Sequence, residues 1–118
     1  MKILVVDDDM LAAEMTSAIL ESVGHDTLIA DNALAGLELL GQHADIELVV
    51  SDLNMPLVSG IEFYQELCEQ GRTLPFIVLT GDSVGSLLED NPGLAAVLTK
   101  DFDLTETLPQ AVNRLLQS

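Results

Sequence analysis

The sequence predicts an α/β domain in which a parallel β-sheet is covered by helices on both faces. Two observations carry this prediction. Short apolar runs alternate along the chain with longer segments in which apolar residues recur at helical spacing. The apolar runs are continuous rather than interrupted at every second position, which is typical of strands buried on both faces of a parallel sheet. The repeated strand–helix order with short connections favours the same arrangement.

The chain opens with two strand–helix pairs. The run Ile-Leu-Val-Val predicts a strand over 3–6, and apolar residues at every fourth position predict an amphipathic helix over 10–23 that stops at the following glycine. A short strand is expected over 26–30. Either residue of the Asp-Asn pair at 31–32 can cap the second helix, which is predicted to run through Leu40 and to end at the next glycine.

Three more strands and two clear helices follow. A strongly apolar run predicts a strand over 46–51, and a loop containing Met-Pro leads into a helix over about 60–70 that a glycine closes. Continuous apolar residues predict strands over 76–79 and 95–98, and a helix over about 105–117 ends the chain.

Two features interrupt this regular pattern. The segment 81–93 contains glycines and a proline and supports at most two turns of helix, near 83–89. Pro109 is tolerated in the last helix only if that helix starts late, because the first turn does not need the missing N–H. We therefore expect a short fourth helix and a late start to the fifth.

The composition describes one acidic domain, to which we assign residues 1–118. A chain of 118 residues with 48% hydrophobic content suits a single buried core. Its formal charge of −16 repels nucleic-acid phosphates and anionic membranes. The single cysteine, Cys68, cannot form an internal disulfide, and neither a signal peptide nor an apolar run of about 20 residues is evident. We therefore expect a cytoplasmic domain that binds neither nucleic acid nor membrane directly.

Polar side chains stand where four of the five predicted strands end. They are Asp7, Asp8, Asp52, Thr80 and Lys100. Ligands of doubly wound sheets bind beyond the carboxyl ends of the strands. We therefore expect one crevice that carries three carboxylates, a hydroxyl and an ammonium group.

Three neighbouring carboxylates require a compensating positive charge, because two unit charges 4 Å apart repel by about 4 kcal/mol at an effective dielectric near 20. Mg²⁺, or the similar Mn²⁺, takes one or two carboxylates together with waters and a phosphate oxygen. Asp8 and Asp52 are the candidate direct ligands, with the backbone carbonyl of Asn54 as a third. Asp7 is expected to hold a metal-bound water.

A carboxylate in such a site can attack phosphorus. Asp52 is the candidate nucleophile, and the remaining groups would supply charge stabilisation and alignment. Lys100 offers a point charge to one phosphate oxygen, and Thr80 offers a hydroxyl donor to another. A movement of Thr80 toward a new phosphate would pull the loop that begins at Gly81.

These residues resemble the CheY-like receiver domains of two-component response regulators. The likeness rests on strings that together cover nearly the whole chain. They are Ile-Leu-Val-Val-Asp-Asp at 3–8, Asp-Leu-Asn-Met-Pro at 52–56 followed by Gly60, Leu-Thr-Gly at 79–81, and Lys100. The resemblance implies a flavodoxin-like (βα)5 sandwich with a five-stranded parallel sheet in the order 2-1-3-4-5.

The resemblance also implies a role for each site residue. Asp52 is the phosphoacceptor, Asp7 and Asp8 form the acidic pair at the metal site, and Thr80 and Lys100 are the switch hydroxyl and the phosphate-contacting lysine. The domain is then a signalling module that catalyses only its own phosphorylation and dephosphorylation.

The implied partners are a donor and a receiver of the signal. The donor is a phosphohistidine on a sensor histidine kinase or a histidine phosphotransfer protein. The output passes to another domain or protein through the face made by the fourth helix, fifth strand and fifth helix. The domain is expected to be a monomer or a phosphorylation-dependent dimer.

The sequence departs from the family pattern at three places. Asp101 follows Lys100, where the family has a proline joined by a cis peptide; a cis non-proline bond costs about 2.5–4 kcal/mol, so this bond is expected to be trans or strained. Val97 stands where the family has an aromatic switch residue. The segment 81–93 is poor material for a stable fourth helix.

Two other function classes fit part of this pattern. A pseudo-receiver would keep the fold and bind proteins without phosphorylation, which Val97 and Asp101 favour. A haloacid-dehalogenase-like phosphohydrolase would use Asp7 as nucleophile and Asp9 as acid, but it would leave Asp52 without a role and the chain has no room for a cap.

Overall fold

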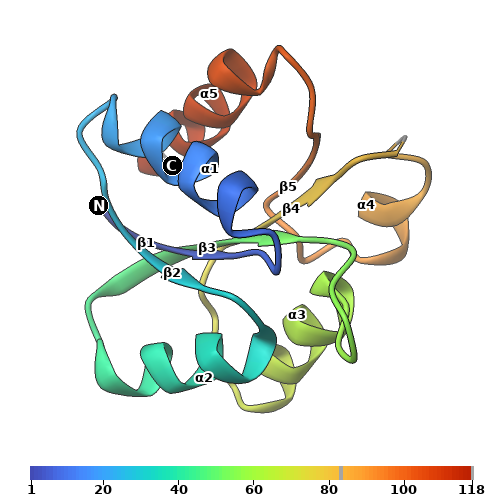
Figure 1. Ribbon diagram of the computed structural model, residues 1–118. Helices are drawn as coiled ribbons and strands as arrows, with labels where there is room; N and C mark the ends of the chain where they lie inside the picture. Colours follow the sequence, from blue (N-terminus) through green and yellow to red (C-terminus); the bar gives the residue numbers. More distant parts are fainter. Residues whose placement is uncertain (83, 118) are drawn as a thin grey trace.

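The protein, represented by a computed structural model, is described over residues 1–82 and 84–117. Its five strands form one parallel sheet in the order β2-β1-β3-β4-β5, which confirms the expected fold class and strand order (Figure 1). The strands are β1 (Lys2–Val6), β2 (Asp26–Ala30), β3 (Ile46–Asp52), β4 (Phe76–Thr80) and β5 (Ala96–Thr99). The helices are α1 (Met10–Glu21), α2 (Ala33–Gln42), α3 (Gly60–Glu69), α4 (Leu87–Asp90) and α5 (Leu104–Gln117).

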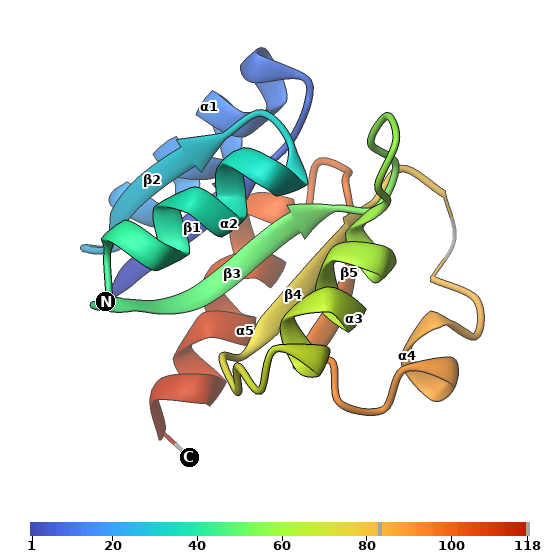
Figure 2. The ribbon, with the colours of Figure 1, turned by 90° about the horizontal axis from the view of Figure 1, so that it is seen from below.

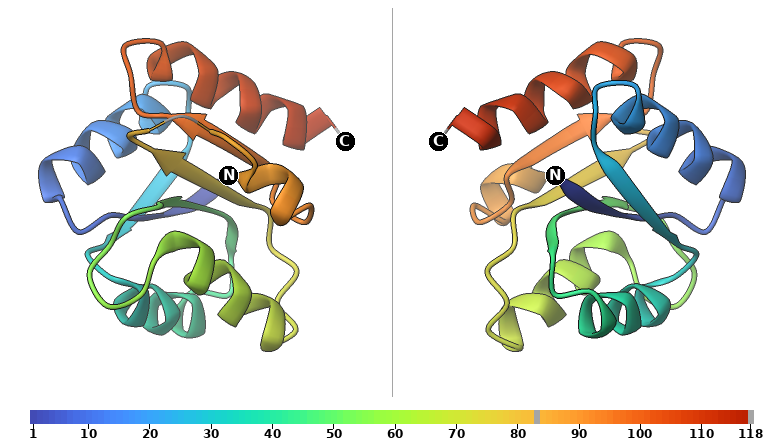
Figure 3. Two further views of the ribbon diagram at one scale, coloured as in Figure 1. Left: turned by 90° about the vertical axis from the view of Figure 1, so that its right-hand side faces the viewer. Right: turned by 90° about the vertical axis from the view of Figure 1, so that its left-hand side faces the viewer.

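Helices cover both faces of the sheet. α1 and α5 lie on one face and α2 and α3 on the other, while α4 lies beside the β5 edge (Figures 1 and 2). Figure 3 shows the two helical layers with the sheet between them. Among the described residues, no helix combines the length and the apolar character that a bilayer-spanning segment needs.

Two hydrophobic clusters, one on each face of the sheet, hold the layers together. Ile3 and Val5 pack into the cluster formed with α1 and α5, and Leu4 and Val6 pack into the cluster formed with α2 and α3. Successive residues of β1 thus serve opposite faces, which explains why its apolar run is continuous. Full burial of each such side chain stabilises the fold by roughly 1.5–3 kcal/mol.

Side-chain caps define where three helices begin. Asp9 Oδ1 accepts hydrogen bonds from two backbone N–H groups in the first turn of α1. Asn32, rather than Asp31, caps α2 by accepting from Ala35 N at 2.8 Å. Ser59 and Glu62 form a reciprocal capping box at the start of α3. These caps satisfy backbone N–H groups that have no partner within the first helical turn.

Two predicted helix ends differ slightly from the structure. α1 ends at Glu21 rather than at residue 23. α2 passes through Gly41 and ends at Gln42, because the His43 N–H still donates to the Leu39 carbonyl at 2.8 Å. A helix interior tolerates one glycine at a cost of about 1 kcal/mol.

α5 starts at Leu104, within one residue of the predicted start, but the expectation that Pro109 lies in its first turn is wrong. The Asp101 carbonyl accepts from Leu104 N at 3.1 Å, so the helix is already turning at Leu104 and Pro109 lies inside it. Pro109 has no N–H, so it cannot donate a hydrogen bond to the carbonyl of Thr105, four residues earlier. Thr105 is exposed, so water can satisfy that carbonyl.

The fourth helix is short, as expected. α4 makes a single turn over Leu87–Asp90. Ser83, where the predicted range begins, lies outside the described residues.

Candidate functional site

Strand pairing brings the predicted site residues to one edge of the sheet. The parallel register pairs Val6 with Ser51, Asp52 with Leu79, and Thr80 with Thr99. The next residues along β1 and β5, Asp7 and Lys100, therefore emerge at the same edge as Asp52 and Thr80. This is the carboxyl edge at which ligands of parallel sheets bind.

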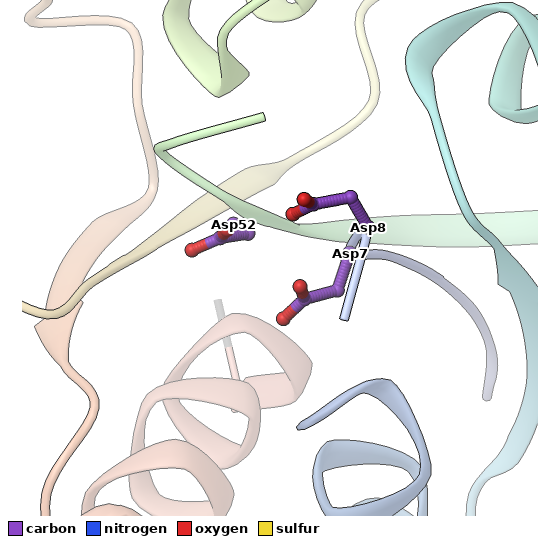
Figure 4. A group of neighbouring side chains, drawn as sticks. All are labelled: Asp7, Asp8 and Asp52. Atoms are coloured by element: carbon purple, nitrogen blue, oxygen red, sulfur yellow. The ribbon is translucent and has the colours of Figure 1, made fainter. Parts of the chain in front are cut away.

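Three carboxylates meet at this edge. One oxygen from each of Asp7, Asp8 and Asp52 lies within 4.8 Å of the other two. Asp7 and Asp8 extend from the end of β1 toward Asp52 at the end of β3 (Figure 4). Asp7 is 2% and Asp52 8% exposed, whereas Asp8 is exposed to solvent. These hard oxygen donors match the ligands that Mg²⁺ and Mn²⁺ prefer.

Both oxygens of Asp7 already have partners. Oδ1 accepts from Asp9 N at 3.0 Å, and Oδ2 accepts from Lys100 Nζ at 2.7 Å. Asp8 is the more accessible member of the pair. This difference favours Asp8 as a direct metal ligand and Asp7 as a residue that positions other groups.

Gly60 holds the loop after β3 close to the site. Its N–H donates to the Leu53 carbonyl at 2.8 Å, and a Cβ at this position would overlap the Asp52 carbonyl oxygen. Only glycine permits this close approach. Gly60 thus fixes the backbone that carries Asp52, as well as starting α3.

Lys100 joins the two buried carboxylates. Its Nζ lies 2.7 Å from Asp7 Oδ2 and 2.9 Å from Asp52 Oδ1. Its backbone N–H donates to the Thr80 carbonyl at 2.7 Å, which anchors the lysine at the end of β5. The sequence placed Lys100 at this edge but did not reveal that its ammonium group bridges the carboxylates. The cluster of negative charge is the feature of the sequence that could have indicated this bridge, because neighbouring carboxylates need a cation close to them.

Burial governs the charge state of the site. It raises the pKa of the Asp52 carboxyl above its usual range despite the opposing effect of Lys100, and Asp7 and Asp8 add to the rise. Burial by itself would lower the pKa of Lys100, but the hydrogen bonds and charges of Asp7 and Asp52 together outweigh it and raise that pKa. Lys100 is therefore protonated at neutral pH, yet one ammonium group does not offset the full cost of burying charged Asp52. A metal cation would reduce that cost further.

Thr80 is fully buried at the end of β4. Its Oγ1 accepts from Asp82 N at 3.1 Å, so the side chain is tied directly to the loop that follows the strand. A change in the position of this hydroxyl would alter the same loop. Its contact with a phosphate stays a prediction.

Asn54 lies in the β3–α3 loop with an exposed side chain. The role of its backbone carbonyl as a metal ligand stays a prediction.

The two departures near β5 are structurally accommodated. Val97 packs in the core cluster on the α2/α3 side. No cis peptide bond occurs among the described residues, so Lys100 and Asp101 are joined by a trans bond. Asp101 Oδ1 accepts from Asp103 N at 3.0 Å and thereby shapes the turn into α5.

An apolar groove that the sequence did not indicate opens beside the site. It has a volume of 570 Å³ and lies between α1 and the β5–α5 loop, where Met15, Ile19 and Phe102 line it together with Lys100. Phe102 is fully exposed. The groove extends the site from the acidic edge onto an apolar surface.

Comparison with known proteins agrees with this geometry. The response regulator receiver domain family matches residues 3–113. A probable transcriptional regulatory protein of Picosynechococcus is 32% identical over 113 residues, covering 89% of this chain and 45% of that protein. The chain spans about half or less of the length of the curated relatives it matches.

Solved structures show the same likeness. A response regulator receiver protein from Pseudomonas putida is 31% identical, with a TM-score of 0.86 over 96% of this chain and 95% of that one. The response regulator TrrA from Thermotoga maritima, in complex with Mg²⁺-BeF, is 26% identical, with a TM-score of 0.85 over 97% of each chain. Because the family match extends over nearly the whole chain and coincides with the strand order and the acidic edge described above, the protein belongs to the response regulator receiver domain family of two-component systems.

Proposed function

We propose that Asp52 accepts a phosphoryl group in a reaction that requires Mg²⁺ or Mn²⁺. The observation that carries this proposal is a buried Asp52 carboxylate that both faces Lys100 and shares a potential metal cluster with Asp7 and Asp8. In the transfer, the N–P bond of a phosphohistidine breaks and a P–O bond to Asp52 forms. A small phosphodonor such as acetyl phosphate would replace the phosphohistidine in vitro.

Asp8 and Asp52 would hold the metal, with the Asn54 carbonyl as a third protein ligand and Asp7 on a metal-bound water. When bound, the cation supplies positive charge to the phosphate oxygens. The clustered carboxylate oxygens support this assignment, as does the Mg²⁺-BeF complex of TrrA.

Lys100 and Thr80 would respond to the new phosphate. The Lys100 ammonium, now 2.9 Å from Asp52 Oδ1, would move to a phosphate oxygen. Thr80 would donate its hydroxyl hydrogen to another oxygen, and the Asp82 N–H bonded to Thr80 Oγ1 would carry this shift into the β4–α4 loop. The modification at Asp52 thereby reaches the α4-β5-α5 face.

The partners follow from this chemistry. The phosphoryl donor is a sensor histidine kinase or a histidine phosphotransfer protein, and the α4-β5-α5 face passes the signal to an output domain or partner protein. The domain is a cytoplasmic signalling module that catalyses only its own phosphorylation and dephosphorylation. It works as a monomer or as a phosphorylation-dependent dimer, without direct contact to nucleic acid or membrane.

Intact-mass measurement after incubation with Mg²⁺ and acetyl phosphate tests this function. We expect the mass gain of one phosphoryl group in the parent protein and none in Asp52→Asn or in the presence of EDTA. A parent protein that gains no mass would instead support a pseudo-receiver, the alternative that Val97 and Asp101 favour. Asp9 is engaged as the cap of α1, which argues against its use as the acid of a dehalogenase-like hydrolase.

A further inference from the structure

The face formed by α2 and α3 carries two adjoining hollows. One, of 430 Å³, lies between the two helices, and the other, of 350 Å³, lies between the start of α2 and the β3–α3 loop. Ala33, Leu34 and Val58 line both hollows, so they form one continuous depression. α2 and α3 lie side by side on the face opposite α1 and α5 (Figures 1 and 2).

The floor and rim of this depression are apolar and accessible. Leu34 is 68% exposed and Leu57 is 100% exposed, and Val58 is also at the surface. Leu57 adopts a φ of 69°, a left-handed conformation that is unfavourable for a residue of this type. The β3–α3 loop therefore presents a large apolar side chain to solvent. These exposed side chains offer an apolar contact area to a partner.

Carboxylates surround the apolar floor. Glu62, Glu66 and Glu69 are exposed along α3 at a spacing of four and three residues, so they share one side of the helix. Asp8 and Asp31 line the other end of the depression. No lysine or arginine is among the described residues that line either hollow. A second copy of this acidic face would be repelled, whereas a basic partner would be attracted.

We propose that the α2–α3 face binds a basic amphipathic helix of a partner protein. A groove between two helices accepts a third helix through its apolar face. α3 has ten residues and is about 15 Å long, which matches about three turns of a partner helix. Leucine-type residues of that helix would fill the depression beside Leu34 and Val58, and lysines or arginines at i, i+4 and i+7 would face the three glutamates of α3. This binding goes beyond the phosphoacceptor function and does not require it.

A labelled peptide tests the proposal directly. The probe is an amidated peptide of about 14 leucine and lysine residues with leucines at i, i+3, i+4 and i+7, long enough to form a helix on the protein. Fluorescence anisotropy at about 0.15 M salt measures its affinity for the full chain. We expect Glu66→Lys combined with Glu69→Lys to weaken binding at least about tenfold. Glu14→Lys combined with Glu106→Lys, on exposed sites of α1 and α5, makes the same change in net charge and should weaken binding less than about threefold.

A matched apolar pair separates this face from the groove beside α1. Leu34→Ser should weaken binding, whereas Met15→Ser should not, although Leu34 is 68% exposed and Met15, which lines the groove beside α1, is 61% exposed. Methyl NMR should show shifts at Leu34, Leu57 and Val58 on addition of the peptide. Equal weakening by both charge pairs, shifts confined to α1 and α5, or no binding to the parent protein would overturn the proposal.

Discussion

Replacing Asp52 with asparagine should stabilise the metal-free protein while it removes the proposed phosphoacceptor. The Asp52 carboxylate lies within 4.8 Å of oxygens of Asp7 and Asp8, and each pair repels by roughly 3.5 kcal/mol at an effective dielectric near 20. The attraction between the Lys100 ammonium and Asp52 Oδ1, 2.9 Å apart, is roughly 5.7 kcal/mol at the same dielectric. The attraction and the two repulsions are of similar size, so burial decides the balance and makes the charged Asp52 carboxylate destabilising. We therefore expect Asp52→Asn to gain about 1–2 kcal/mol in EDTA.

Thermal unfolding followed by circular dichroism measures this gain. For a domain of this size, 1 kcal/mol corresponds to about 4 °C in Tm, so Tm in EDTA should rise by about 4–8 °C. In Mg²⁺ the parent should become more stable than Asp52→Asn. A ligand at 100 times its Kd adds about 2.7 kcal/mol to the free energy of unfolding of a protein with an intact site, and it adds less to the variant.

The pH dependence provides an internal check. Burial raises the pKa of Asp52 in the folded state, so its destabilising effect is complete above that pKa and disappears once the carboxyl is protonated in both states. The stability advantage of Asp52→Asn should therefore be largest near pH 7 and shrink as the pH falls toward about 4. The electrostatic reasoning would be refuted if Asp52→Asn were less stable than the parent in EDTA, or if Mg²⁺ stabilised the variant as much as it stabilises the parent.

Three further changes probe the site and its surroundings. Lys100→Met should destabilise the protein by roughly 3 kcal/mol in EDTA, because it leaves two buried carboxylates without their ammonium partner, and Mg²⁺ should restore much of the loss in chemical denaturation. Gly60→Ala should cost about 1–3 kcal/mol and slow phosphorylation, because its Cβ would overlap the Asp52 carbonyl. The control for this variant is Gly41→Ala, because a Cβ added at Gly41 meets no neighbouring atom. Burial, and after it the N-terminal charge, lowers the pKa of His25 in the folded protein. The free energy of unfolding should therefore fall as the pH drops below about 6.5 and through the lowered pKa of His25. His25→Gln should make this decline less steep.

Each of these three changes has an outcome that would contradict its reasoning. Unchanged stability of Lys100→Met in EDTA would show that the bridge contributes nothing. Equal effects of the two glycine variants would show that the close approach at Gly60 is not required. A decline of the same steepness in His25→Gln would assign the acid sensitivity to other groups.

The strands and the acidic edge could be predicted from the sequence because both depend on local pattern. The run that includes Leu4 and Val5 must be buried on both faces, and the residues that follow such strands must share one edge of a parallel sheet. Asp7, Asp52 and Lys100 therefore lie together where expected.

Features that depend on contacts between residues far apart in the sequence could not be predicted in the same way. The bridge from Lys100 to two carboxylates requires the position of a flexible side chain from the opposite end of the chain. The start of α5 depends on the turn formed by Asp101, which overrides the preference of Pro109 for a first turn. The α2–α3 depression arises only when residues of two helices and a loop come together.

Mapping the site of the acid-labile phosphoryl group gives the most direct evidence on the proposed chemistry. After incubation with Mg²⁺ and acetyl phosphate, borohydride reduces an acyl phosphate to an alcohol, and peptide mass spectrometry identifies the residue that changed. We expect the change at Asp52 alone, with none in EDTA. Reduction at Asp7, or modification that proceeds equally without a divalent cation, would contradict the assignment of Asp52 as a metal-assisted phosphoacceptor.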